Sequence, residues 1–369
     1  MGYDRNIQGG IMSMLGQLII TGISGTSLLD EEREFLEKEN IGGVILFSNN
    51  YESPAQLAEL VNQIQTTRKE YPLFVCVDNE GGRVFRFKTG FTKFPPMMEL
   101  GSLNSPKTVF ECSQIMAKEL KACGVNLNLA PVCDIVNNEQ NKVIGDRAFG
   151  KDAETVSKYI SSVIRGLQTS DILSCAKHFP GHGCTTKDSH FDLPIIKKPL
   201  DELRNEEFLP FIKAIKSRVE FLMMAHVIVE DINPDLPTSL CPEAYQILRD
   251  ELRYTKLIIS DDMQMKAIAD RYSYEEAAVM AINAGADIVE YKDMEFARKA
   301  LDGLKKAQKN QELKNETIVD RYNRVKSCKE RNLKEYSPIY IPELSKVVGT
   351  KASIEYVEEV KAKIEELNS

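Results

Sequence analysis

Short apolar runs rich in β-branched residues alternate with longer amphipathic segments along most of the chain. Eight short runs have the length and composition of buried strands: Gln17–Ile20, Val44–Phe47, Leu73–Val77, Val125–Leu129, Ile172–Cys175, Phe221–Met224, Leu257–Ile259 and Asp287–Val289. Helical stretches such as Ser53–Lys69 and Ala153–Gln168 lie between them. Strands that alternate with helices pair in parallel, because each crossover returns the chain to the same end of the sheet. Eight such units predict an α/β fold, a single (β/α)8 TIM barrel with a short C-terminal helical tail.

A doubly wound open sheet is the alternative interpretation of this alternation. That fold usually has fewer strands and a glycine-rich turn after the first one. The segment after the first predicted strand, Thr21–Thr26, does not match G-x-G-x-x-G. The pattern therefore favours the barrel.

The repeat ends near residue 330, so we expect a catalytic barrel over residues 1–335 and a linker with a helix over residues 336–369. Residues 331–350 include Pro338 and Pro342 and are expected to be extended. Five apolar residues then recur at helical spacing: Ile354, Val357, Val360, Ile364 and Leu367. This spacing predicts an amphipathic helix that either packs on the barrel wall or forms a dimer contact.

The charge balance excludes two classes of partner. The chain has 47 basic and 55 acidic residues and a formal net charge of -8. Such a surface repels nucleic acid and anionic membranes, so we expect neither as a partner. The apolar stretch Ile11–Ile20 is interrupted by Ser13, Gly16 and Gln17. We interpret it as a helical turn that leads into the first strand, rather than as a signal peptide.

The chain has eight cysteines and no C-x-x-C pair. Cys76, Cys133 and Cys175 lie in or just after predicted strands, where a reduced thiol behaves as a small hydrophobe. We therefore expect free thiols and a cytoplasmic protein.

Polar residues gather where the predicted strands end, which in a barrel is the end that carries the chemistry. The chain has only four histidines, of which three lie within residues 178–190 and the fourth follows another strand: His178, His182, His190 and His226. Histidine changes charge near neutral pH, so this grouping indicates catalysis or metal binding.

Asp261 and Asp262 follow the seventh predicted strand. Successive side chains of a strand point to opposite sides, so we expect only one of them to face the pocket. We assign Asp261 to the pocket and expect Asp262 to cap the following helix.

At this point the motifs resemble a known family. Lys177–Gly183 followed by Asp188, Ser189 and His190 is similar to the signature of family 3 glycoside hydrolases of the NagZ type, which are β-N-acetylglucosaminidases. Further segments match in the expected order: Gly43–Phe47, Asp78–Arg86, Ala130–Val132, Asp146–Gly150, Met224–Val227 and Ser260–Met263. The resemblance covers roughly residues 12 to 330 and implies a retaining, exo-acting enzyme on a TIM barrel without a cofactor or a metal.

The resemblance also implies roles for individual residues. Asp261 would be the nucleophile, His190 the general acid/base and Asp188 its orienting partner. Five further residues would hold the terminal sugar: Asp78, Arg86, Arg147, Lys177 and His178. Asn79 stands where a glutamine is expected after the aspartate, and residues 331–369 match nothing in the family.

The implied chemistry is physically reasonable. A retaining glycosidase usually pairs a carboxylate nucleophile with a carboxylic acid. An imidazole can replace that acid, because its unperturbed pKa of about 6.5 suits proton transfer near neutral pH. We expect Asp188 to fix the tautomer of His190, and we expect nearby cations to lower the pKa of Asp261: Lys177, Arg86 and Arg147.

Several alternatives remain open at this stage. A metal-dependent hydrolase could bind zinc through the four histidines and Asp261. Barrel metal sites generally place a His-x-His near strand one, however, and the first histidine of this chain is His178. A non-catalytic sugar-binding homologue would lack the nucleophile or the acid. A family 3 enzyme could prefer another sugar, or use phosphate in place of water as a glycoside phosphorylase. The expected partner is a small oligosaccharide, either a muropeptide in peptidoglycan recycling or a chitooligosaccharide, bound by a monomer or weak dimer.

Overall fold

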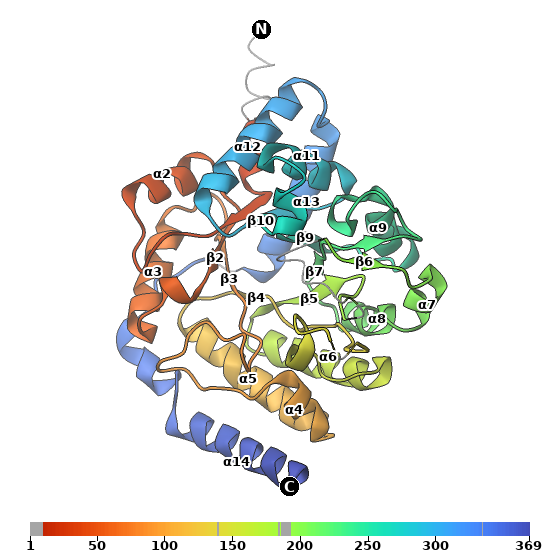
Figure 1. Ribbon diagram of the computed structural model, residues 1–369. Coiled ribbons are helices and arrows are strands. Elements are labelled where there is room, and N and C mark those ends of the chain that lie inside the picture. The colour runs from red at the N-terminus through yellow and green to blue at the C-terminus, as the bar shows by residue number, and fades with distance from the viewer. Residues whose placement is uncertain (1–9, 139, 184, 186–192, 334) are drawn as a thin grey trace.

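The computed structural model describes residues 10–138, 140–183, 185, 193–333 and 335–369 (Figure 1). Eight parallel strands form a closed barrel in the order β1-β10-β9-β7-β5-β4-β3-β2. These strands are β1 (Ile19–Thr21), β2 (Gly43–Leu46), β3 (Phe74–Val77), β4 (Leu127–Asn128), β5 (Leu173–Phe179), β7 (Phe221–Met224), β9 (Leu257–Asp262) and β10 (Ile288–Tyr291). The barrel closes where Ile19 of β1 pairs with Val289 of β10. The predicted TIM barrel is confirmed.

Helices surround the barrel and connect its strands (Figure 1). They are α2 (Asp30–Lys38), α3 (Pro54–Thr66), α4 (Met97–Ser102), α5 (Pro106–Ala122), α6 (Ala153–Gln168), α7 (Leu200–Asn205), α8 (Phe208–Lys216), α9 (Pro242–Gln246), α10 (Lys266–Ala269), α11 (Tyr274–Ala284), α12 (Met294–Lys309), α13 (Asn315–Asn332) and α14 (Lys351–Asn368). Ser53, Ser105 and Asp152 begin α3, α5 and α6, and each side chain accepts a hydrogen bond from a backbone N–H of the first turn. A small sheet of β6 (Ile195–Ile196) and β8 (Ile228–Val229) lies outside the barrel.

All eight predicted strands overlap strands of the barrel, and β5 and β9 continue furthest beyond their predicted ends. β5 runs on through Lys177 and His178 to Phe179, and β9 runs on to Asp262. The apolar pattern stops earlier because the polar side chains at these strand ends line a cavity rather than the core. The turn predicted before β1 is also present, since residues 10–16 are helical.

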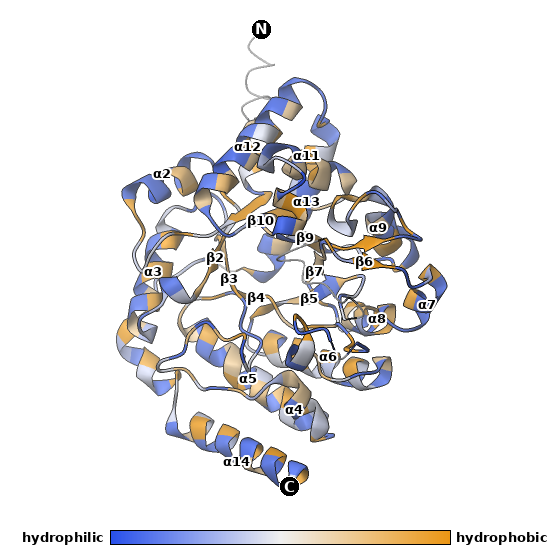
Figure 2. Ribbon diagram, viewed as in Figure 1, coloured by the Kyte–Doolittle hydropathy of each residue, from blue (hydrophilic) through white to orange (hydrophobic). Residues whose placement is uncertain are grey.

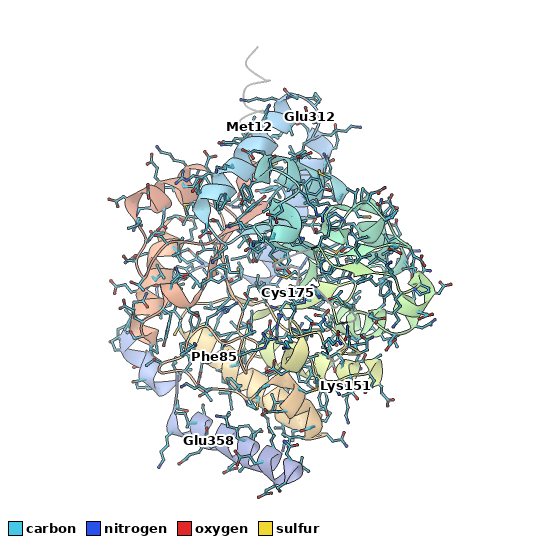
Figure 3. All side chains as sticks on the ribbon, viewed as in Figure 1. Met12, Phe85, Lys151, Cys175, Glu312 and Glu358 are labelled. Carbon is cyan, nitrogen blue, oxygen red and sulfur yellow. The ribbon has the colours of Figure 1, made fainter. Side chains whose placement is uncertain are left out.

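The barrel interior is apolar, and Figure 2 shows the hydrophobic residues concentrated on the strands. Cys175 lies near its centre (Figure 3), and the rings of Phe74 and Phe221 meet edge-to-face with centroids 5.2 Å apart. The seven described cysteines are all buried free thiols, as predicted; Cys184 lies outside the described residues.

A buried lysine occupies the end of the barrel where the strands start. Nζ of Lys329, from α13, donates hydrogen bonds of 2.8 Å to Oε1 of Gln17 and to the carbonyl oxygen of Gly42. It also lies 4.8 Å from the centroid of the Phe74 ring. No carboxylate of the described residues pairs with Lys329, and burial lowers its pKa to about 7.

The C-terminal tail returns along the outside of the barrel. Residues expected to be extended include a 3-10 turn over Ile341–Lys346, and the predicted terminal helix is α14. α14 contacts α4 and α5 (Figure 1), and Val357, Val360 and Ile364 form its buried face. This arrangement agrees with packing on the barrel wall, whereas the domain boundary at residue 335 stays a prediction. None of the described helices is both long and apolar enough to cross a bilayer.

Candidate active site

A cavity of about 870 Å³ opens at the ends of the barrel strands where the polar motifs lie. Six of the eight predicted site residues line it: Asp78, Arg86, Arg147, Lys177, His178 and Asp261. The other two, Asp188 and His190, lie outside the described residues. A second cavity of about 540 Å³ lies around the starts of the strands and contains none of the predicted site residues.

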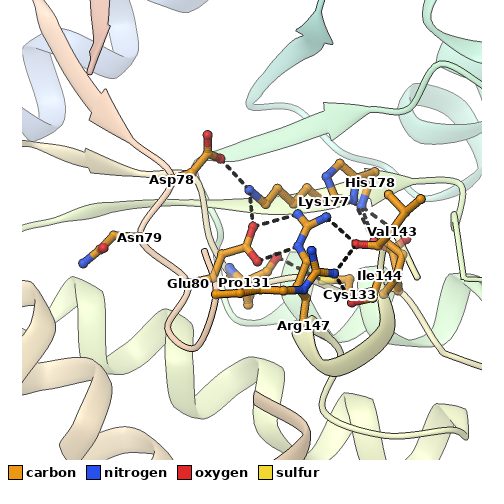
Figure 4. Close-up of polar contacts among 12 residues, drawn as sticks. Asp78, Asn79, Glu80, Pro131, Cys133, Val143, Ile144, Arg147, Lys177 and His178 are labelled. Carbon is orange, nitrogen blue, oxygen red and sulfur yellow. Dashed lines mark hydrogen bonds and ion pairs between the residues drawn. The ribbon is translucent and has the colours of Figure 1, made fainter. Parts of the chain in front are cut away.

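Lys177 joins two carboxylates on one side of the cavity (Figure 4). Its Nζ lies 2.7 Å from Oδ1 of Asp78 and 2.7 Å from Oε1 of Glu80. The other oxygen of Asp78 accepts a hydrogen bond of 3.2 Å from Arg86. Burial alone would raise the pKa of Asp78, but the charges of Lys177 and Arg86 outweigh it and hold that pKa below its usual value.

Arg147 binds Glu80 through two parallel hydrogen bonds, each 2.8 Å long, from Nε and Nη2. Its Nη1 donates to the carbonyl oxygen of Val143 at 3.1 Å. Burial opposes ionisation of Glu80, yet Arg147 and Lys177 together hold the pKa of Glu80 far below its usual value. Sequence reasoning missed Glu80, although it lies within the quoted Asp78–Arg86 segment. It holds two of the predicted sugar-binding cations in place.

His178 is held by a buried carboxylate that the sequence did not single out. Nδ1 of His178 lies 2.7 Å from Oδ2 of Asp134, and Oδ1 of Asp134 accepts the backbone N–H of His182 at 2.7 Å. Burial would raise the pKa of Asp134, but its contacts with His178 and His182 lower it. The only signal in the sequence was an acidic residue directly after the apolar run Ala130–Cys133.

The three described histidines gather at the mouth of the barrel but have different surroundings. His178 and His182 line the cavity, with ring centroids 6.3 Å apart. His226 is fully buried, with Nδ1 2.7 Å from the hydroxyl of Ser239 and Nε2 3.0 Å from the carbonyl oxygen of Asp262. In the part of the chain that the structure describes, which excludes His190, no three His, Cys, Asp or Glu side chains form a group that could hold a metal ion.

Asp261 lies at the end of β9, and its Oδ1 accepts the backbone N–H of Asp262 at 2.9 Å. Burial would raise the pKa of Asp261, but the imidazoles of His178 and His226 lower it, with smaller effects from that N–H and from Lys177. The pKa of Asp261 is therefore lowered, as predicted, but the two histidines contribute more to this shift than Lys177 does. Arg86 and Arg147, which were also expected to lower it, instead pair with the carboxylates of Asp78 and Glu80.

The prediction that Asp262 caps a helix is wrong. A turn follows β9 before α10 begins, and Met265 precedes that helix. Oδ1 of Asp262 instead accepts the backbone N–H groups of Gln264 and Lys292, at 3.0 and 3.3 Å, and so ties the end of β9 to the loop after β10. The expectation that only one of the two aspartates faces the pocket is also wrong, because both Asp261 and Asp262 line the cavity. Burial raises the pKa of Asp262 to about 6.

Glu290 is a further cavity residue that sequence reasoning missed. It lies within the apolar strand β10, and its side chain is only 3% exposed. Its Oε2 has no hydrogen-bond partner among the described residues. Burial, together with the negative charges of Asp78, Asp262 and Asp261, raises its pKa well above the usual value.

A comparison with known protein families finds the glycosyl hydrolase family 3 N terminal domain over residues 11–328. The chain belongs to glycosyl hydrolase family 3. It is 39% identical over 282 residues to a protein of Nitrosomonas eutropha named beta-hexosaminidase, a match that covers 74% of this chain and 80% of that one. The family membership predicted from the motifs is thus confirmed over nearly the same residues.

Solved structures of this family share the fold. A family 3 beta-N-acetylglucosaminidase from a Paenibacillus species is 33% identical, with a TM-score of 0.88 over 95% of this chain and 68% of its own. A beta-N-acetylhexosaminidase from Beutenbergia cavernae is 26% identical, with a TM-score of 0.82 over 87% of this chain and 98% of its own. Together with the relatives, these neighbours show that this family 3 protein is a glycoside hydrolase, whose substrate is a small carbohydrate.

Proposed function

We propose that this family 3 enzyme is an exo-acting β-N-acetylglucosaminidase that removes terminal, non-reducing β-linked N-acetylglucosamine with retention of configuration. The observation that carries the proposal is the carboxylate of Asp261, which lines the cavity at the end of β9 and whose pKa is lowered by the neighbouring histidines. An ionised carboxylate at this position can act as a nucleophile. The names of the relatives supply the class of sugar.

In the proposed reaction Asp261 attacks the anomeric carbon, while His190 donates a proton to the leaving oxygen. Asp188 accepts a hydrogen bond from His190 and stabilises the imidazolium. The product of this step is a covalent glycosyl ester of Asp261. His190 then removes a proton from a water molecule, which attacks the anomeric carbon and releases the sugar with its original configuration.

The remaining predicted residues would bind the terminal sugar. Ionised Asp78 only accepts hydrogen bonds, so it can bind two neighbouring hydroxyls. The ammonium of Lys177 has three N–H groups, of which Asp78 and Glu80 accept two, and the third would donate to a sugar oxygen. Nε2 of His178 is the ring nitrogen not held by Asp134 and would reach the sugar from β5. Arg86 and Arg147 complete the proposed sugar site.

We expect a cytoplasmic enzyme, which fits buried free thiols. Its substrates would then be muropeptides, in peptidoglycan recycling, or chitooligosaccharides. A glycoside phosphorylase is the second candidate, because a histidine in place of a carboxylic acid leaves less negative charge near the anomeric carbon for an anionic acceptor to meet.

The test compares kcat/KM for the nitrophenyl β-glycosides of N-acetylglucosamine, glucose and xylose, and follows the products by NMR. We expect strong preference for N-acetylglucosamine and the β-anomer as the first product. A preference for glucose, or the α-anomer as first product, would contradict the proposal. The same reaction in phosphate buffer distinguishes free sugar from sugar 1-phosphate, and so decides between hydrolysis and phosphorolysis.

A His190→Ala variant tests the acid. Nitrophenolate is a good leaving group and needs little protonation, whereas a sugar leaving group needs a proton. We expect the variant to lose much more activity on chitobiose than on the nitrophenyl substrate. Equal losses on both substrates would refute the role of His190.

A further inference from the structure

Glu290 combines three properties that rarely occur together. It is almost fully buried, it lines the cavity that contains Asp261, and its Oε2 lacks a hydrogen-bond partner among the described residues. A buried polar atom without a partner destabilises a folded protein, so its presence in the strand β10 needs a reason.

The surroundings of Glu290 are mostly negative. The charged groups that act most strongly on its carboxyl are Asp78, Asp262, Asp261 and Lys177, and the buried thiols of Cys76 and Cys175 also interact with it. The ammonium of Lys177 already binds Asp78 and Glu80, and no described cation forms an ion pair with Glu290. Burial among negative groups favours the protonated form of a carboxyl, and a protonated carboxyl is a hydrogen-bond donor.

Glu290 shares its cavity with the residues that are proposed to bind the sugar. In the proposed function the anomeric carbon meets Asp261 and the hydroxyls at the far side of the ring meet Asp78. Glu290 lines the same cavity as both of these carboxylates, so a sugar bound between them occupies the space that Glu290 borders.

We propose that Glu290 is a further substrate-binding residue, whose protonated carboxyl donates a hydrogen bond to one hydroxyl of the terminal sugar and thereby contributes to the choice of sugar. The proposal rests on the proposed function, because it takes the sugar from there. The ionised Asp78 and Asp261 can only accept hydrogen bonds, so Glu290 adds a donor on the side of the cavity formed by β10.

The experiment measures kcat/KM for nitrophenyl N-acetylglucosaminide and for its 3-, 4- and 6-deoxy analogues. It uses the wild type and the variants Glu290→Gln and Glu290→Leu. In the wild type we expect removal of one hydroxyl to lower kcat/KM about tenfold through the loss of this hydrogen bond, which corresponds to about 1.4 kcal/mol. Gln keeps a donor, so the penalty at that position should persist in Glu290→Gln. In Glu290→Leu it should fall to less than about twofold.

Two controls keep the result interpretable. Glu290→Met is made in parallel, because the flexible Met side chain adapts to an irregular space if Leu does not fit. Glu119→Gln changes another buried glutamate that binds Thr92 and Gly349 on the outside of the barrel, and should leave every deoxy penalty as in the wild type. We also expect the apolar variants to melt at a higher temperature, because they remove a buried oxygen that has no hydrogen-bond partner among the described residues.

Deoxy penalties that are the same in the wild type and in the folded apolar variant, at all three positions, would overturn the proposal. Failure of the proposed function would look different, since the wild type would then not cleave N-acetylglucosaminides at all.

Discussion

A carboxylate oxygen of Asp134 lies 2.7 Å from Nδ1 of His178, and the other oxygen of Asp134 accepts the backbone N–H of His182 at the same distance. One buried side chain thus orients an imidazole of the cavity and also fixes the start of the segment that leads to His190. Asp134 does not line the cavity, so we interpret it as a positioning residue.

We predict that Asp134→Asn lowers kcat/KM at least about tenfold, because an amide cannot accept both from Nδ1 of His178 and from the backbone as a carboxylate does. The measurement is kcat/KM on nitrophenyl N-acetylglucosaminide at 25 °C, with folding checked by circular dichroism. Asp302→Asn, on the exposed side of α12, is the matched control and should behave as the wild type. An unchanged kcat/KM in folded Asp134→Asn would show that the contact is not needed.

The ion pairs of Glu80 predict how stability depends on acid. The pKa of Glu80 is lowered below its ordinary value of 4.5, so the unfolded chain binds more protons than the folded protein in the acidic range. The contribution of Glu80 to the free energy of unfolding is therefore complete above about pH 4.5 and is lost as the pH falls further. We expect Glu80→Gln to be destabilised by about 3–5 kcal/mol at neutral pH, because Arg147 and Lys177 lose a buried partner.

The same variant should lose less of its remaining stability than the wild type between about pH 5 and 3.5. Urea unfolding at several pH values measures both quantities. If the free energy of unfolding fell equally with pH in the wild type and in Glu80→Gln, the acid sensitivity could not be assigned to Glu80.

Lys329, at the other end of the barrel, predicts a second rise of stability with pH, in the neutral to alkaline range. Its pKa is lowered to about 7 in the folded protein from an ordinary value of 10.5, so the unfolded chain binds more protons between these values. The free energy of unfolding should therefore rise with pH above about pH 7, by up to about 1.4 kcal/mol per pH unit. Lys329→Met should lack this rise, and the difference between the two proteins between about pH 7 and 8.5 is the quantity to measure. Equal slopes would show that Lys329 stays charged.

Substitutions in the terminal helix α14 distinguish packing on the barrel wall from a dimer contact. Val360 is buried in α14, whereas Ile354 of the same helix is 44% exposed. Val360→Ala should lower the free energy of unfolding by about 1–2 kcal/mol, and Ile354→Ala by less than about 0.5 kcal/mol. A lower mass of Ile354→Asp than of the wild type in light scattering would instead identify the exposed face as a dimer contact.

The barrel could be predicted from the sequence because each strand is a local run of apolar residues between helical stretches. Phe221–Met224 is reproduced residue for residue, whereas the predicted ends of β5 and β9 fall short of the polar side chains that line the cavity. The amphipathic spacing of Val357, Val360 and Ile364 likewise predicted α14 without any knowledge of its contacts.

The contacts of the site could not be predicted in the same way, because they join residues far apart in the chain. Lys177 and Asp78 are 99 residues apart, and Arg147 and Glu80 are 67 apart. Composition and spacing carry no signal for such pairs, so Glu80 and Asp134 were missed although Lys177 and His178 were singled out. Glu290 was hidden for a different reason, since it lies inside an apolar strand where a charged residue is not expected.

The central claim is that Asp261 forms a covalent bond with the sugar, and its most direct test is trapping. A 5-fluoro N-acetylglucosaminyl fluoride slows both steps of a retaining reaction, because the ring fluorine opposes positive charge in the transition state, but its good leaving group lets the intermediate accumulate. Mass spectrometry of the intact protein and of its peptic peptides then locates the adduct. We predict one sugar per chain, attached to Asp261, and no label in Asp261→Ala. A label on any other residue, or complete turnover to the α-anomer without an adduct, would contradict this account.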